Sequence, residues 1–136
     1  MAKKLLLKYK FDLETINQVV HCIGCHRFKR GEAPQSEEAK ILFDADKLDA
    51  IGATGIGRAF LFAGEIGSKL HNDKNIDIYK TEEYSKEDTA YREFALKLIK
   101  IKNKLFTKEG KRMANERHRF MLNFFHRLNK ELNGDL

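Results

Sequence analysis

Apolar residues recur at every third or fourth position along most of this chain, and only one proline interrupts the pattern. This spacing places apolar side chains on one face of an α-helix, whereas a half-buried strand needs a period of two. It predicts a short lead-in helix over residues 3–10 and long helices near 12–26, 36–51, 54–64, 86–106 and 107–133. With 136 residues, 42% of them hydrophobic, the chain suits one modest core. We therefore predict a single all-α domain over residues 1–136.

The signals at the ends of these segments agree with the periodicity. Asp12 and Ser36 are residue types that cap helix N-termini, and Asn133-Gly134 is a C-terminal stop. Between about residues 64 and 85 the pattern fades into polar and glycine positions. A stretch of that length without structure is uncommon in a compact domain, so we expect it to be either mobile or functional.

Hydropathy and net charge limit the cellular locations and the classes of binding partner that we expect for this protein. The longest apolar run near the start is Leu5 to Leu7, too short for a secretory signal, and no later run could span a bilayer. We expect a cytoplasmic protein. The net charge of +6 suits an anionic partner such as a phosphate ester, a nucleic acid or an acidic protein, and it equally suits a basic surface that only keeps the protein soluble. The aromatic residues fall on apolar stripes instead of alternating with basic residues, which argues against a nucleic-acid module.

A C-x-x-C-H sequence lies at residues 22–26, formed by Cys22, Cys25 and His26. Covalent haem attachment is one interpretation, but that chemistry follows export and the chain has no export signal. A zinc site that adds His21 would crowd four ligands into six residues of one helix, where they cannot all face one ion. We expect both cysteines to be free thiols that pack on a helix.

The most informative stretch is 40–60, where acidic residues interrupt an apolar helix pattern. In a helix Asp46 shares a face with Leu42 and Phe43, and Asp49 lies one turn further. A carboxylate on an apolar face must be paired, hydrogen-bonded or metal-bound. An ion pair with Arg58 would meet that need, and so would a metal. Gly55 and Gly57 each cost about 1 kcal/mol of helix propensity relative to alanine, so we expect a close backbone approach there.

This stretch resembles the end of the HD domain in small stand-alone bacterial phosphohydrolases of the HD superfamily. The matching residues are 44–52, reading Asp-Ala-Asp-Lys-Leu-Asp-Ala-Ile-Gly, followed by Gly55, Ile56, Arg58 and Phe60. His-Arg-Phe at 26–28 and Ala-Asn-Glu-Arg-His-Arg-Phe-Met at 114–121 also look like the family. The resemblance covers nearly the whole chain and implies an HD-domain-like helical bundle.

In that family an early histidine, a His-Asp pair and a distant aspartate hold a divalent metal, which activates water to attack a phosphate ester. The resemblance makes Asp46 the distant metal ligand. It places His26 near the substrate phosphate or a second metal, and Arg27 and Lys47 near phosphate oxygens. Asp49 and Arg58 would support the site.

The chain departs from the family because it contains no His-Asp dipeptide. The helices that carry the first three ligands should precede residue 1, so we expect a domain truncated at its N-terminus: a fragment, a natural truncation or the product of a misplaced start. One hypothesis is a metal-dependent phosphohydrolase acting on a phosphate ester or nucleotide, inactive or incomplete as this chain. The other is a non-catalytic helical remnant that acts through oligomerisation or a protein partner.

Overall fold

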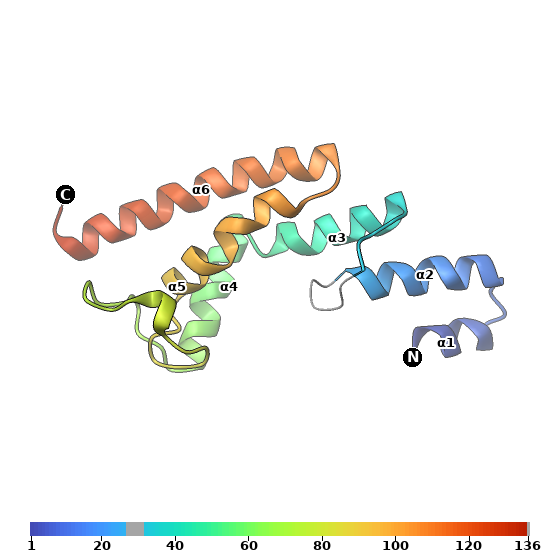
Figure 1. Cartoon of the computed structure of the whole chain (residues 1–136), viewed down its shortest axis with the longest axis horizontal. Coiled ribbons are helices and arrows are strands. Elements are labelled where there is room, and N and C mark those ends of the chain that lie inside the picture. The colour runs from blue at the N-terminus through green and yellow to red at the C-terminus, as the bar shows by residue number, and fades with distance from the viewer. Residues whose placement is uncertain (27–31, 136) are drawn as a thin grey trace. The chain divides into compact units, whose positions relative to one another are not determined.

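The computed structural model describes residues 1–26 and 32–135, and Figure 1 traces its elements in chain order. These residues form six α-helices and two short 3₁₀ helices, and no strand occurs among them. The predicted all-α fold is confirmed. Where the sequence predicts one domain, the chain groups into two compact units, residues 1–46 and 47–136. None of the helices in the described ranges is long and apolar enough to cross a membrane.

The first unit contains α1 (Ala2–Lys8), α2 (Leu13–Cys25) and most of α3 (Glu37–Asp49). Asp12 caps α2 as predicted, because its side chain accepts a hydrogen bond from the Thr15 backbone N–H at 2.8 Å. Helices α1 and α2 contact each other, yet α1 buries no residue. The buried apolar residues of this unit are few: Ile16, Cys25, Ala39 and Phe43.

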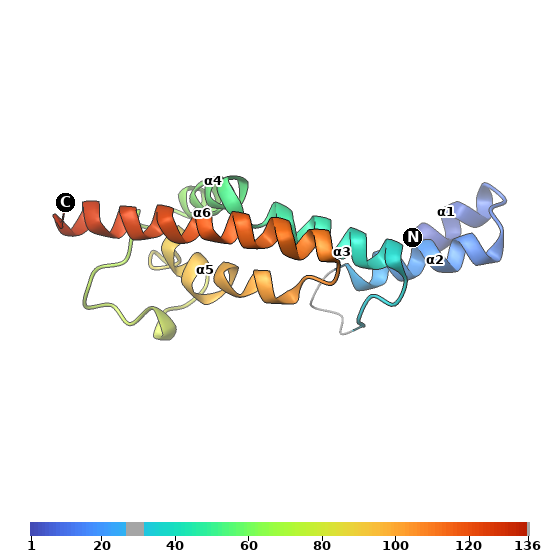
Figure 2. The same cartoon turned by 90° about the horizontal axis from the view of Figure 1, so that it is seen from above.

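The second unit is built on α4 (Gly52–Glu65), α5 (Ala90–Leu96), the 3₁₀ helix η3 (Leu98–Lys104) and α6 (Lys108–Asn133). Figures 1 and 2 show α5 and η3 alongside α6, and α6 contacts both α4 and η3. The core between them is apolar and aromatic, with the Phe94 and Phe125 rings stacked at 4.3 Å. Such packed rings supply much of the apolar area that a core of this size can bury.

The prediction of one α-helix over residues 86–106 is wrong. Helix α5 begins only at Ala90, after the Thr89 side chain caps it, and it ends at Leu96. Lys97 adopts φ −122° and ψ −56°, and the chain continues as η3. The apolar residues of this segment are nevertheless buried, since residues three apart, such as Leu98 and Ile101, share a face in a 3₁₀ helix as well.

A tight corner joins α3 to α4, and two glycines make it possible. Gly52 has φ +79°, a left-handed conformation that L side chains rarely adopt. A Cβ on Gly55 would lie 2.2 Å from the Ala50 carbonyl oxygen, so only glycine allows this approach. The Arg117 side chain of α6 covers Gly52 and donates a hydrogen bond to the Leu48 carbonyl near the end of α3. The expected close approach is confirmed at Gly55 but not at Gly57, which has open space around its Cβ position.

The segment between α4 and α5 is held by polar contacts, although it contains only the three-residue helix η2 (Ile78–Lys80). Buried Asn72 donates to the Glu87 carbonyl at 2.8 Å and accepts from the Thr89 hydroxyl at 2.6 Å. The buried pair Asp88–Arg92 joins at 2.8 Å, and Arg92 also donates to the Thr81 carbonyl. Because these buried groups satisfy one another, the segment has a defined path against the helices.

The two helix glycines at the start of α4 provide a matched test of the corner. We expect Gly55→Ala to destabilise the protein by about 2 kcal/mol or more, because the new methyl group meets a backbone oxygen. Gly57→Ala should instead stabilise it by up to about 1 kcal/mol through helix propensity alone. Urea denaturation followed by circular dichroism measures both. Equal effects of the two substitutions would contradict the close approach at Gly55.

The buried pair Asp88–Arg92 should dominate the stability of the α4–α5 segment. Removing one partner leaves an uncompensated buried charge, so we expect Asp88→Ala to cost about 3–5 kcal/mol. The exposed pair Arg127–Glu131 is the control, and Glu131→Ala should leave the free energy of unfolding almost unchanged. Denaturant titrations of the two variants compare them directly. Similar stabilities would show that the buried pair does not brace this segment.

Candidate functional site

Helix α3 carries three aspartates, which differ in their exposure to solvent. Asp44 is buried, with 3% of its surface exposed, whereas Asp46 and Asp49 are exposed. The expectation that Asp46 faces the interior is therefore wrong. A buried carboxylate is the costlier one to keep charged, so Asp44 is the aspartate whose surroundings the fold constrains most.

The reason lies in the phase of the helix. The sequence pattern places Leu42 on the same face of α3 as Asp46, but Leu42 is 43% exposed. The buried positions are instead Ala39, Phe43, Asp44, Lys47 and Leu48. Their mean direction is rotated away from Asp46, which falls just outside the buried sector.

The cations predicted beside these aspartates also differ in exposure. Lys47 is buried, with 7% of its surface exposed. Arg58, on α4, is exposed and forms an ion pair with Asp49 across the glycine corner. The sequence offered Arg58 as an ion-pair partner of Asp46, and the structure pairs Arg58 with Asp49. A pair exposed to this degree is easily exchanged for another partner.

The residues of the C-x-x-C-H sequence make local contacts at the end of α2. The Cys25 thiol lies 3.7 Å from the Cys22 carbonyl, and His26 Nδ1 lies 2.6 Å from the Ile23 carbonyl. Burial raises the pKa of the Cys25 thiol. Both cysteines are free, as expected. Arg27 lies outside the described residues, so its predicted role has no structural counterpart here.

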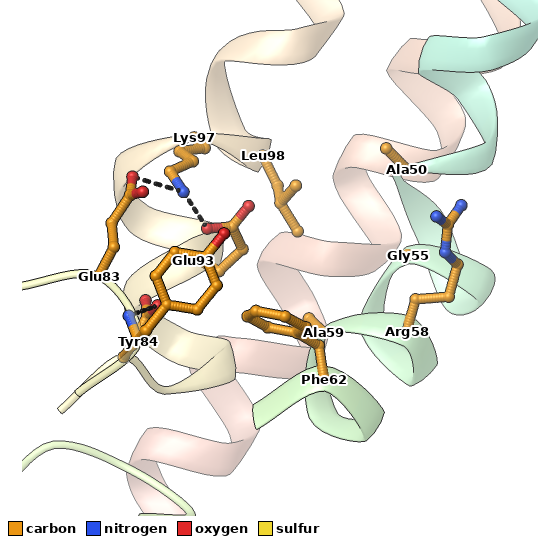
Figure 3. A pocket seen from close by; sticks show the side chains of 11 residues that line it. Ala50, Gly55, Arg58, Ala59, Phe62, Glu83, Tyr84, Glu93, Lys97 and Leu98 are labelled. Carbon is orange, nitrogen blue, oxygen red and sulfur yellow. Dashed lines mark hydrogen bonds and ion pairs between the residues drawn. The ribbon is translucent and has the colours of Figure 1, made fainter. Parts of the chain in front are cut away.

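A pocket of about 340 Å³ lies in the second unit, between α4 on one side and α5 with the preceding segment on the other. Its apolar lining includes the buried residues Ala59 and Leu98 and the exposed rings of Phe62 and Tyr84. Ala50 and Gly55, at the glycine corner, lie at the opposite end, where Arg58 extends toward Ala50 (Figure 3). The pocket therefore adjoins the same stretch of sequence that resembles the HD family.

Charged side chains meet at the end of the pocket nearest Tyr84. The Lys97 ammonium lies 2.9 Å from a Glu93 oxygen and 3.1 Å from a Glu83 oxygen (Figure 3). Burial acts to lower the pKa of Lys97, but hydrogen bonds to Glu93 and Glu83 outweigh it and raise the pKa. Two carboxylates thus share one ammonium group, and this corner carries a net negative charge.

The backbone of Tyr84 is unusual. Its φ is +61°, a left-handed conformation that is a genuine outlier for a bulky residue. The Tyr84 N–H donates to the buried Asp88 carboxylate at 2.7 Å, and its ring meets Phe62 edge to face at 5.9 Å. Backbone strain of this kind persists only where the surroundings enforce it, and it concentrates at binding sites.

Sequence reasoning missed the residues at the Tyr84 end of this pocket. Phe62, Glu83, Tyr84 and Glu93 carry no motif, and Lys97 reads as one more solvent-facing lysine of a helix. One signal did point there, namely the long stretch between α4 and α5 without helical periodicity. A left-handed tyrosine and the break in the helix at Lys97 depend on tertiary contacts, which no sequence pattern of this length reveals.

The described residues do not assemble a site for a divalent metal. Within residues 1–26 and 32–135 no group of three or more His, Cys, Asp or Glu side chains is placed to hold an ion. A catalytic divalent metal takes several protein ligands. The described residues therefore do not fit a complete metal centre, and Asp46 would need ligands from elsewhere.

No family model matches this chain, but individual relatives do. The protein YpgQ of Bacillus subtilis (strain 168) is 39% identical over 125 residues, which is 89% of this chain and 55% of YpgQ. A crystal structure of YpgQ superposes with a TM-score of 0.76 at 34% identity, covering 98% of this chain and 63% of YpgQ. A second YpgQ structure, in complex with ADP, gives a TM-score of 0.71 at 35% identity, covering 95% and 58%.

A solved structure with a family assignment is also similar. It is an HD-superfamily hydrolase from Bacillus thuringiensis, 32% identical with a TM-score of 0.74, and the match covers 96% of this chain and 60% of the hydrolase. The chain thus spans between 55% and 63% of the length of these relatives. Sequence identity and superposition agree over almost all of this chain. It is an all-α protein with the HD-domain-like fold of an HD-superfamily hydrolase.

Proposed function

We propose that this chain supplies the nucleotide-binding helices of an HD-type phosphohydrolase and does not complete a catalytic metal centre by itself. The observation that carries the proposal is the superposition on an HD-superfamily hydrolase at 32% identity. It is supported by a pocket beside the α3–α4 corner, where the resemblance to the family is densest. A relative of this fold binds ADP, which makes a nucleotide or another phosphate ester the substrate class that we assign.

Within this proposal α3 contributes the carboxylate that would join a divalent metal. Asp46 holds that role by resemblance, and Asp44 is the second candidate because it is the buried one. The metal would supply Lewis-acid chemistry and an activated water when bound. Since the described residues do not gather enough ligands, no hydrolytic step is derived through it.

In this proposal the phosphate is bound by positively charged side chains near the α3–α4 corner. Arg58 is the leading candidate because its side chain is 62% exposed and its pair with Asp49 can be exchanged for a phosphate oxygen. Lys47 is buried, so it can reach a phosphate only at a site that excludes water. The resemblance assigns His26 to the substrate phosphate or a second metal and Arg27 to phosphate oxygens, and we propose the same roles here. The two free cysteines support a cytoplasmic location, where thiols stay reduced.

Nucleotide binding provides the first test. We expect ADP to bind the 136-residue chain and Arg58→Ala to weaken binding about tenfold, because a charge-assisted hydrogen bond is lost. Arg112→Ala is a matched control, since the Arg112 side chain is also exposed, at 63%, and paired with Glu109. Isothermal titration calorimetry measures all three proteins. Absence of ADP binding, or equal losses in the two variants, would refute the assigned phosphate contact.

Turnover provides the second test. We expect no release of phosphate from nucleotides or phosphomonoesters with Mn²⁺ or Mg²⁺ present, because the described residues do not form a complete metal centre. A phosphate-release assay with a complete HD-type hydrolase as positive control measures this. Turnover that disappears in Asp46→Asn or Asp44→Asn would show that the centre is complete, and the variant that loses it would identify the metal-binding carboxylate.

A second candidate function is association with another polypeptide. The observation that favours it is the exposed apolar surface of residues 1–46. The large apolar side chains exposed there are Met1, Leu5, Leu7, Tyr9, Phe11, Leu13, Val20, Ile23, Ile41 and Leu42. In this case the chain would act as a non-catalytic helical protein that forms homo-oligomers or binds a protein partner.

Light scattering coupled to gel filtration tests the association. We expect a mass above that of one 15.8 kDa chain, and we expect Leu13→Glu to lower it, because Leu13 is 67% exposed at the start of α2. Leu132→Glu is the control, as Leu132 is an exposed leucine near the end of α6. A monomer that also fails to bind an apolar dye would exclude this function.

A further inference from the structure

We infer that the pocket between α4 and α5 is a nucleobase subsite, which takes an aromatic heterocycle bearing an amino group. The inference rests on the proposed nucleotide-binding function and adds to it the orientation of the ligand. Two exposed rings, an apolar floor and a negatively charged corner meet in one pocket of about 340 Å³. That volume lies within the range of about 300–1,000 Å³ that small-molecule sites occupy.

The aromatic residues provide the first argument. Tyr84 is 71% exposed and Phe62 is 41% exposed, yet both line the pocket and touch each other. Large aromatic side chains that stay exposed next to an apolar floor offer ring surface for stacking. Because every nucleobase has a π face, such surface binds bases through stacking.

The backbone of Tyr84 provides an independent argument. A left-handed conformation is costly for tyrosine, and the hydrogen bond from its N–H to the buried Asp88 maintains it. Asp88 is itself fixed by Arg92, within the polar network that holds the segment. The contacts of Asp88 therefore hold the Tyr84 backbone in a strained conformation, and in this conformation the tyrosine ring lines the pocket.

The charges select the kind of heterocycle. Glu83 and Glu93 share the single ammonium group of Lys97, so this corner accepts hydrogen bonds and disfavours a phosphate. An exocyclic amino group, such as that of adenine, donates to a carboxylate. The phosphates then belong at the other end of the pocket, where Arg58 extends toward Ala50, away from the aromatic rings (Figure 3).

Phosphate-free probes separate this subsite from the phosphate site. Amide chemical shifts of the ¹⁵N-labelled chain would be followed during titration with adenosine, with purine riboside, which lacks the amino group, with ADP and with pyrophosphate. We expect adenosine to perturb the residues that line the pocket and to bind more tightly than purine riboside. Tyr84→Gly should weaken adenosine binding about tenfold.

The variants keep the test independent of folding. Glycine adopts φ near +61° without strain, so Tyr84→Gly removes the ring but relieves the backbone. Tyr79→Gly is the control, because Tyr79 is 77% exposed in the same segment and does not line the pocket. Glu93→Gln should reduce the preference for adenosine over purine riboside, because a charged acceptor becomes a neutral one.

Each outcome decides one of the two ideas. If adenosine leaves the pocket signals unmoved, or if folded Tyr84→Gly binds it as tightly as the wild type, the subsite is refuted. Should ADP and pyrophosphate still bind in those cases, the proposed phosphate function stands. If adenosine binds as expected but phosphate adds no affinity and shifts no signal near Arg58, the subsite stands and the phosphohydrolase proposal falls.

Discussion

The backbone contact between Gly55 and the Ala50 carbonyl determines where α4 can start relative to the end of α3. No other residue permits it, since a Cβ would lie 2.2 Å from that oxygen. Arg117 reinforces the corner from α6 by covering Gly52 and bonding to the Leu48 carbonyl. The position of Arg58 on α4, and with it one end of the pocket, follows from this corner. The glycines of the family-like stretch thus allow the tight turn between α3 and α4, and its charged residues are the ones to which we assign ligand binding.

Helical periodicity predicted the architecture well, because burying one face of each helix is a local requirement. The all-helical character, the Asp12 cap and the close approach at Gly55 all agree with the structure. The type of helix after Lys97 was not predictable, since α and 3₁₀ geometry both accept a spacing of three. At Lys97, where the geometry changes, the side chain pairs with Glu83 of the preceding segment and with Glu93 of α5.

The candidate site was less accessible to sequence reasoning. Asp44 and Asp46 are two positions apart and point to nearly opposite sides of α3, so the rotation of the helix about its axis decides which of them is buried. A periodic pattern with several equivalent apolar positions leaves that rotation open. The pocket residues come from α4, α5 and a segment without periodicity, and only folding brings them together. The family resemblance located one side of the pocket and gave no signal for the other.

The buried contact between Asp88 and the Tyr84 backbone has a kinetic and thermodynamic consequence. The tyrosine is already held in its unusual conformation by groups inside the protein. A ligand that binds beside Tyr84 would not have to order this segment. The conformational entropy of the segment is lost when the protein folds and not when the ligand binds. The association rate constant would then approach that of two rigid bodies, and differences in residence time between ligands would reflect the contacts that each ligand makes.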